Sequence, residues 1–541
     1  MLNFKLTQKD YTIGGQGYQL KLPLDIEYMI PKDDSVRLLG QIVEELDLKE
    51  LYKTYSRIKE NYATPRQMLK VMLYAYMNHI YSSRKIESSC QRDVNFMYLL
   101  EGKHAPDHAS IARFRSCHFA PVSKTIISRL TLFLAECGEI SFENLFIDGT
   151  KIESAANKYT FVWRKSVDKN MEKMITKIPM FVQKAEEDFG IHLIYDGNIQ
   201  LRHLKKLRKK LKKVQEEEEI VFVHGSGKHK TLLQKTIEEL DGYLKRFKKY
   251  VKQLHLCGER NSYSKTDIDA TFMRMKEDYM KNGQLKPAYN VQFGVDSEYI
   301  VWAMAGPQPA DATTLIPFLN ETREYLNHKY EKIIADSGYE SEENYVYLEK
   351  NGQLAFIKPT NYEISKTRKY KADISRKENM VYHSESDYYT CRNGKKLVIT
   401  GERKSKSKTG YETIKTQYTC ESCNGCSYKT QCIKGHNSKT PMKERTKHLE
   451  ISKVFQEKRQ DDLERILSDK GIELRINRSI QSEGAFADVK GDMEFRRFLT
   501  RGYTNVLAES ILLAMGHNIN KLHHKIQNNC FARYLHKVKS A

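Results

Sequence analysis

The 541-residue sequence lacks the long apolar runs, the collagen-like composition and the secretory leader that define several classes of protein. Its longest apolar runs fall far short of about 18 residues, so no membrane span is predicted. With 28 glycines and 12 prolines, collagen-like or low-complexity material is excluded. The first ten residues are polar and contain no apolar stretch typical of a secretory signal. We therefore expect a cytoplasmic protein.

Positive charge is what the sequence has in excess. It holds 90 Lys and Arg against 69 Asp and Glu, a formal net charge of +21. Hydrophobic residues make up 40% of the chain, which is enough for real cores and argues against global disorder. The length suggests three or four structural units at roughly 100–200 residues each. The charge points to a polyanion partner, with solubility alone as the alternative.

The first 140 residues are predicted to be mostly helical, because apolar residues recur at three- and four-residue steps over 68–80. Asp107 is expected to cap a short helix that carries Arg113 and Arg115. A capped helix with arginines suits a helix-turn-helix-like DNA contact, and a helical bundle with a solvated basic face is the alternative.

Two short apolar strands are each followed by an aspartate. Leu-Phe-Ile at 145–147 precedes Asp148, and Ile-Ile-Ala at 333–335 precedes Asp336. A carboxylate at the end of a buried strand is costly unless it is solvated or binds a cation, so both residues are site candidates. Between them, a β-hairpin is predicted over 288–304, followed by a helix with Asp311 as its N-cap.

Two other segments have unusual composition. Apolar stripes over 201–214 and 237–254 predict an antiparallel helical hairpin, and its first arm holds a run of basic residues that includes Lys209. This run favours phosphate contact at least as much as a solvated face. The second segment, 361–445, is basic and tyrosine-rich and is predicted to be an insertion.

Five of the ten cysteines are close together, at Cys391, Cys420, Cys423, Cys426 and Cys432. The last four favour a structural tetrahedral zinc site over disulfides in a reducing compartment. Unligated thiols are the alternative, and an iron–sulfur site is disfavoured because the ferredoxin continuation is missing.

Near the C-terminus, Glu483, Lys490 and Arg497 are spaced seven residues apart, which predicts one face of a helix that begins near Ser479. Glu494 lies eleven residues after Glu483 and would share nearly the same face. Periodicity alone leaves both glutamates as candidates for a third acid.

The order of elements predicts a mixed α/β fold that is RNase H-like: a five-stranded sheet with flanking helices, an all-α N-terminal domain and two insertions. Such a sheet brings acids from its first strand, its fourth strand and a late helix to one edge. Three carboxylates there can bind two divalent ions, and Mg²⁺ or Mn²⁺ suits oxygen ligands.

Three segments, 146–154, 334–339 and 478–490, carry a resemblance to a known family. In them the chain resembles bacterial insertion-sequence DDE transposases with a helical InsH-type N-terminal domain. The resemblance implies that Asp148, Asp336 and Glu483 are the catalytic metal-binding acids. It also implies that Lys490 contacts DNA. The chain departs from the family's Tyr–Arg–Glu–Lys signature, because Arg478 lies five residues before Glu483 rather than four and Arg475 occupies the tyrosine position.

The resemblance implies an enzyme that cleaves DNA at terminal inverted repeats and joins the freed 3′-hydroxyl to target DNA, acting as a homodimer. DNA contacts are expected from Arg113, Arg115, Lys209, Arg478, Lys490 and Arg497. The expected domains are a helical DNA-binding domain (1–140), a catalytic core (141–195, 286–360 and 446–541), a hairpin insertion (196–285) and a cysteine-rich insertion (361–445). The alternatives are a zinc-containing DNA-binding regulator, a catalytically decayed transposase, and a nuclease without strand transfer.

Overall fold

The structure is a computed structural model that describes residues 29–195, 199–225, 227–275, 283–435, 438 and 440–534. The expectation for the first ten residues concerns residues outside these ranges. Within them, no helix is long and apolar enough to cross a membrane.

The N-terminal region is helical, as predicted. Its helices are α2 (Ser35–Glu45), α3 (Lys49–Lys53), α4 (Pro65–Met77), α5 (Ser83–Arg92), α6 (Val94–Leu100), α7 (His108–Arg113) and α8 (Ala120–Glu136). The Thr64 side chain caps α4 in a capping box with Gln67. Asp107 caps α7 as expected, since its carboxylate accepts a hydrogen bond from the Ser110 backbone N–H. A π-helical segment, Phe114–Phe119, then joins α7 to α8.

The central sheet is mixed and has six strands. Its order is β4-β5-β1-β7-β8, with β6 also paired to β5. The strands are β1 (Asn144–Glu153), β4 (Thr271–Arg274), β5 (Leu285–Asp296), β6 (Tyr299–Gly306), β7 (Lys332–Ala335) and β8 (Leu354–Ile357). β1 is antiparallel to β5 and parallel to β7. The five expected strands are therefore present, and β4 adds a short sixth strand beside the start of β5.

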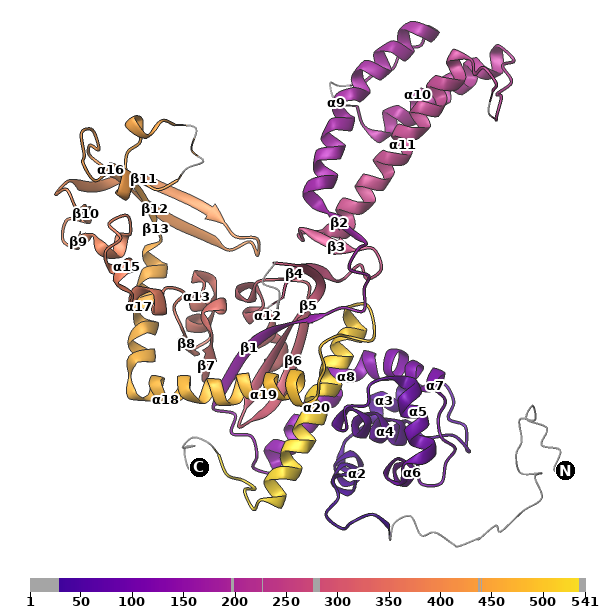
Figure 1. Cartoon of the computed structure of the whole chain (residues 1–541), viewed down its shortest axis with the longest axis vertical. Helices are drawn as coiled ribbons and strands as arrows, with labels where there is room; N and C mark the ends of the chain where they lie inside the picture. The colour runs from indigo at the N-terminus through magenta and orange to yellow at the C-terminus, as the bar shows by residue number, and fades with distance from the viewer. Residues whose placement is uncertain are drawn as a thin grey trace, which may run out of the picture.

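Helices from distant parts of the chain flank this sheet. They are α12 (Leu315–Leu326), α13 (Glu342–Lys350), α17 (Lys453–Leu467), α18 (Asp469–Arg478), α19 (Gly484–Ala487) and α20 (Tyr503–Gln527). The mixed α/β class is thus confirmed. In Figure 1 the sheet is central, with the N-terminal helices at lower right and the two insertions projecting above it on opposite sides.

The N-terminal helices and the sheet share one hydrophobic core rather than forming two separate ones. α20 lies between them, in contact with α4 and α8 on one side and β6 on the other. The Asn518 side chain of α20 exchanges hydrogen bonds of 2.8 and 2.9 Å with the backbone of Ile300 in β6. The expected boundary at residue 140 therefore does not separate two independently packed domains.

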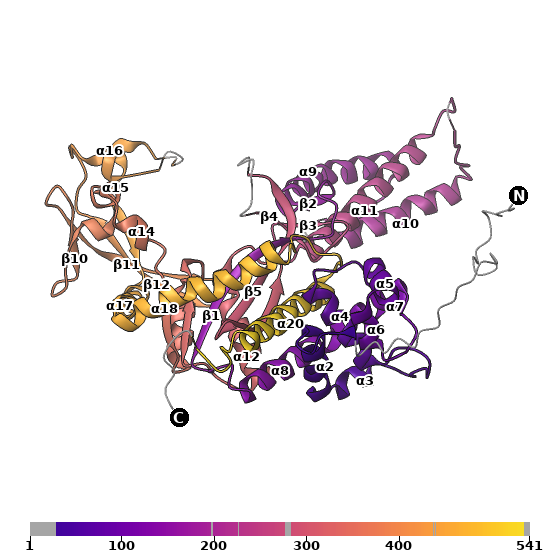
Figure 2. The same ribbon diagram turned by 60° about the horizontal axis from the view of Figure 1, so that its bottom comes forward.

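The first insertion is larger than predicted. It contains α9 (Arg164–Phe189), α10 (Leu201–Glu217) and α11 (Leu232–Cys257), with the short strands β2 (Phe161–Trp163) and β3 (Ser262–Ser264) paired at its base. The three helices bury a cluster of their own, so α9 packs with the insertion although the sequence places it in the segment 141–195 of the expected core. Both views show this helical insertion as a long projection (Figures 1 and 2).

The second insertion is a small β-rich unit. Its sheet has the order β13-β12-β11-β10-β9. The elements are α14 (Tyr362–Ser365), α15 (Arg368–Lys371), β9 (Val381–His383), β10 (Tyr388–Thr390), β11 (Lys396–Lys406), β12 (Glu412–Cys420), α16 (Lys429–Cys432) and β13 (His448–Ile451). Because β13 pairs with β12, the insertion extends past the expected end at residue 445.

Candidate active site

The two predicted aspartates leave neighbouring parallel strands at the same level. The last paired residues of β1 and β7 are Ile147 and Ala335, so Asp148 and Asp336 come next on each strand. β1 does not end at Asp148 as expected, because it continues to Glu153 along β5. Asp148 therefore marks the end of the pairing with β7 rather than the end of its strand.

Both aspartates are held by nearby backbone N–H groups. The Asp148 Oδ1 accepts from the Gly149 backbone N–H at 2.8 Å, and the Asp336 Oδ1 accepts from that of Gly338 at the same distance. Asp148 is only 9% exposed. These contacts fix the orientation of each carboxylate, and carboxylate oxygens are ligands for hard divalent cations.

A π-helical turn brings the third acid to this edge of the sheet. Ser479–Glu483 forms a π-helical segment between α18 and α19, in which hydrogen bonds join residues five apart. The Arg478 Nη2 lies 2.8 Å from the Glu483 Oε1, and its Nη1 lies 3.7 Å from the Asp148 Oδ2. The π turn thus accommodates the five-residue spacing between Arg478 and Glu483, which departs from the family signature. Arg478 contacts two of the three acids, Asp148 and Glu483.

Glu494 and Arg497 both lie outside the helical segment that carries Glu483. The helical segment ends at Asp492, Glu494 has a left-handed backbone with φ of 51°, and its side chain is exposed. The Arg497 guanidinium instead donates to the backbone carbonyls of Ser154 and Ala156, at 3.1 and 3.2 Å. The prediction of one continuous helical face through residue 497 is therefore wrong.

The chemistry of the three acids fits a hard divalent cation. All the donors are carboxylate oxygens, and the Arg478 guanidinium already places positive charge between Asp148 and Glu483. Within the described part of the chain, no three His, Cys, Asp or Glu side chains are gathered as a ready-made metal site.

One further carboxylate, Asp311, lies beside the site, and sequence reasoning assigned it a different role. It begins a 3₁₀ turn, Asp311–Thr313, and its side chain caps no helix. The N-cap prediction is therefore wrong. Its Oδ1 accepts hydrogen bonds from the side-chain amides of Asn290 and Gln292, at 2.6 and 3.0 Å. No spacing in the sequence indicates this approach, because the three residues meet only through the β5–β6 hairpin.

Tyr339 is buried beneath these acids. Its hydroxyl donates to the side-chain oxygen of Gln292, which also holds Asp311. Burial, followed by the charges of Asp311, Asp148 and Asp336, raises the pKa of Tyr339 well above its usual value. Tyr339 is therefore neutral and serves as a hydrogen-bond donor under the acid site.

The residues expected to contact DNA have different environments. Arg113 and Lys209 are exposed, and Lys490 is half-buried. Arg115 is only 6% exposed, because its guanidinium donates to the Tyr81 carbonyl at 3.1 Å and lies 4.0 Å from the buried Glu509. The prediction that Arg115 contacts DNA is therefore corrected: it joins the N-terminal helices to α20.

All five clustered cysteines line one small cavity in the second insertion, at Cys391, Cys420, Cys423, Cys426 and Cys432. The Cys423 Sγ accepts from the Lys447 backbone N–H at 3.3 Å. Burial raises the pKa of the Cys420 thiol to about 12. Structural zinc here stays a prediction.

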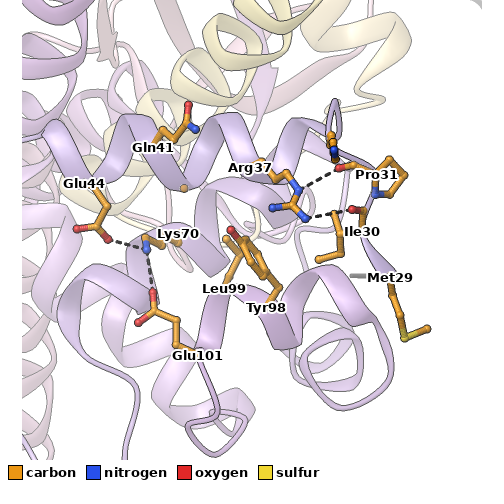
Figure 3. Close-up of a pocket in the computed structure, with 12 residues that line it drawn as sticks. Met29, Ile30, Pro31, Arg37, Gln41, Glu44, Lys70, Tyr98, Leu99 and Glu101 are labelled. Carbon is orange, nitrogen blue, oxygen red and sulfur yellow. Dashed lines mark hydrogen bonds and ion pairs between the residues drawn. The ribbon is translucent and has the colours of Figure 1, made fainter. Parts of the chain in front are cut away.

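A hollow of about 1160 Å³ lies among the N-terminal helices, apart from the acids (Figure 3). On its wall the Lys70 Nζ lies 2.7 Å from the Glu44 Oε1 and 3.0 Å from the Glu101 Oε1. Lys32 and Arg37 also line the hollow, and none of the predicted site residues does.

Comparisons with known families agree with the arrangement of these elements. Residues 390–523 match the family model described as Transposase DDE domain, and residues 24–117 match Transposase domain (DUF772). The first match includes Glu483 and Arg478 but begins after Asp148 and Asp336. No curated protein and no solved structure matches the chain.

The two matches cover separate segments of the chain and indicate similarity to DDE transposases, a class of DNA-processing enzymes. More particularly, they support an insertion-sequence DDE transposase, a family that implies a DNA substrate and the use of divalent metal ions, usually Mg²⁺.

Proposed function

We propose that this protein cleaves DNA at the terminal inverted repeats of its own element and joins the freed 3′-hydroxyl to target DNA. Asp148, Asp336 and Glu483 are the proposed catalytic acids. The observation that carries the proposal is the link from Asp148 through Arg478 to Glu483, residues separated by more than 300 positions in the chain.

The acids would bind two divalent ions, Mg²⁺ or Mn²⁺, which would activate the attacking oxygen and stabilise the leaving oxygen. The chain's own residues prepare the site. The backbone N–H groups of Gly149 and Gly338 orient the carboxylates of Asp148 and Asp336. Arg478 keeps Glu483, whose side chain is 56% exposed, beside the buried Asp148.

DNA binding is proposed to use surfaces outside the acid site. Lys209 lies on an arm of α10 with exposed lysines at positions 205, 206, 210, 212 and 213. Such a run suits phosphate contacts that carry no sequence information. Arg113 and Lys490 are further proposed contacts, and a homodimer would hold the two element ends together. A cytoplasmic, nucleoid-associated location follows from a DNA substrate.

The test incubates the protein and Mg²⁺ with DNA that carries the inverted repeats flanking its gene, together with a target plasmid. The proposal expects both cleaved and joined products, and neither product when EDTA replaces Mg²⁺. Cleavage without joining would favour a nuclease. Specific binding of the repeats without any cleavage would favour the zinc-containing regulator or a decayed transposase.

A further inference from the structure

Asp311 lies in the connection between β6 and α12, and its carboxylate approaches Gly149 within β1 and Gly338 after β7. Among the residues that the structure describes, the hydrogen bonds to this carboxylate come from two side-chain amides. The amides of Asn290 and Gln292 both donate to Oδ1, while Oδ2 is directed toward the turn that follows Asp336. The hydrogen bonds therefore fix the orientation of the carboxylate and direct its second oxygen toward the acid site.

Two glycines make this approach possible. A Cβ on Gly149 would lie 2.6 Å from the Asp311 Oδ1, and a Cβ on Gly338 would lie 3.1 Å from the Asp311 Oδ2. The same Gly338 position is 2.9 Å from the Asp336 Oδ1. Because both oxygens lie close to one point, at 2.9 and 3.1 Å, the two carboxylates are at most 6.0 Å apart.

Two carboxylates this close repel each other, and a divalent cation between or beside them relieves that repulsion. Neutral amides hold Oδ1, so they do not cancel the negative charge of Asp311. The cation of Arg478 is placed on the opposite acids, Asp148 and Glu483. The charge of Asp311 is thus directed at Asp336.

We propose that Asp311 is a fourth carboxylate of the acid site, which strengthens the binding of a divalent cation beside Asp336. The inference rests on the proposed metal-dependent function and adds a residue outside the predicted triad. Its amide anchors also give it a positioning role, because Gln292 connects it to the buried Tyr339.

The charge can be removed while the anchor is kept. In Asp311→Asn the remaining side-chain oxygen can still accept from both amides, and only the charge at Oδ2 is lost. Glu324→Gln, at an exposed position on α12, is the matched control for loss of one negative charge. Mn²⁺ binding is measured by electron paramagnetic resonance on the full chain, with Asp148→Asn defining the signal that belongs to the acid site.

We expect Asp311→Asn to weaken Mn²⁺ binding at this site at least about fivefold, with the unfolding midpoint unchanged to within about 3 °C. Strand joining should fall at low Mn²⁺ concentration and recover when Mn²⁺ is raised. Glu324→Gln should behave like the wild type in all three measurements.

Gly149→Ala tests the same inference without removing a charge. Its methyl group would displace the carboxylate of Asp311 or the amide of Gln292, which lies 2.4 Å from that position. Gly306→Ala is the control, because a Cβ there meets nothing within 4 Å. We expect weaker Mn²⁺ binding in Gly149→Ala alone.

Equal Mn²⁺ affinity in the wild type and in folded Asp311→Asn would overturn the role of Asp311 and leave the proposed triad standing. Wild-type protein that joins no DNA and shows no Mn²⁺ signal sensitive to Asp148→Asn would instead contradict both the proposed function and this inference.

Discussion

At the scale of single residues, Arg478 is the side chain that holds the acid site together. Its guanidinium reaches Asp148 and Glu483 at once, at 3.7 and 2.8 Å. A guanidinium can bond two carboxylates in fixed directions, whereas an ammonium group is a compact point charge. The sequence predicts a DNA contact for Arg478, and its contacts with two carboxylates indicate a role in positioning Glu483 as well.

Arg478→Lys therefore keeps the charge but loses the link. We expect strand joining at saturating DNA to fall by about tenfold or more, since small misplacements of catalytic groups are costly. Binding of the inverted repeat, measured by fluorescence anisotropy, should change less than about threefold. Arg475→Lys, one turn earlier on α18, is the control and should join normally. Weakened binding with normal joining would restore the DNA contact expected from the sequence.

At the scale of elements, α17 is fixed to the sheet by a buried acid. Asp462 is fully buried and accepts hydrogen bonds from the Ile357 backbone N–H in β8 and from the Tyr345 hydroxyl, both at 3.1 Å. Burial raises the pKa of Asp462 to about 7. The helix that leads toward the third acid is thus attached through a group that is protonated below neutral pH.

This protonation makes stability depend on pH. Between about pH 4 and 7 the folded chain keeps a proton on Asp462 that the unfolded chain has lost. The contribution of Asp462 to the free energy of unfolding should therefore fall as pH rises, by up to about 1.4 kcal/mol per pH unit. In Asp462→Asn the urea unfolding midpoint should depend less on pH between pH 5 and 8 than it does in the wild type. Asp461→Asn, at a half-exposed neighbouring position, is the control and should keep the pH dependence of the wild type. A parallel pH dependence in wild type and Asp462→Asn would contradict the assignment.

The lysine arm of α10 is the element proposed to contact phosphates. Lys206 and Lys209 are both exposed on it. Replacing both with Gln should reduce the slope of log affinity against log salt by up to about 2, because each phosphate contact contributes about 0.9. Lys329→Gln with Lys350→Gln, an exposed pair outside this insertion, is the matched control. Equal slopes for the two double variants would show that the arm does not contact DNA.

At the scale of the whole molecule, the structure has one large core and separate satellite cores. The core joins the N-terminal helices, the sheet and α20, whereas α9, α10 and α11 bury a cluster of their own. The base of the helical insertion is the β2–β3 pair, in which Trp163 faces Ser262. A two-residue Asn-Gly turn can close such a pair.

Replacing residues 164–261 with Asn-Gly should therefore leave a folded, monodisperse protein, with its unfolding midpoint within a few degrees of the wild type. Removing residues 1–119 should instead cause aggregation, because it exposes the faces of α20 and α8. Size-exclusion chromatography and thermal unfolding distinguish the two. Aggregation of the first variant would mean that the helical insertion stabilises the core.

The sequence allowed the parts of the site that depend on local patterns to be predicted. Asp148 and Asp336 were indicated because apolar strand residues precede them directly. Asp311 could not be recognised, since its role depends on the close approach of Gly149 and Gly338. The buried state of Arg115 depends on Glu509, which is nearly 400 residues away in the chain. The π turn before Glu483 could not be foreseen from periodicity, which assumes a regular helix.

The most direct test of the central claim is strand joining by Asp148→Asn, Asp336→Asn and Glu483→Gln with Mg²⁺ and DNA that carries the inverted repeats. Glu494→Gln serves as the matched control. We predict that each of the three variants still binds the repeats but loses joined product by at least about a hundredfold, and that Glu494→Gln joins normally. Joining by any of the three at the wild-type rate would contradict the assignment of that residue to the catalytic site.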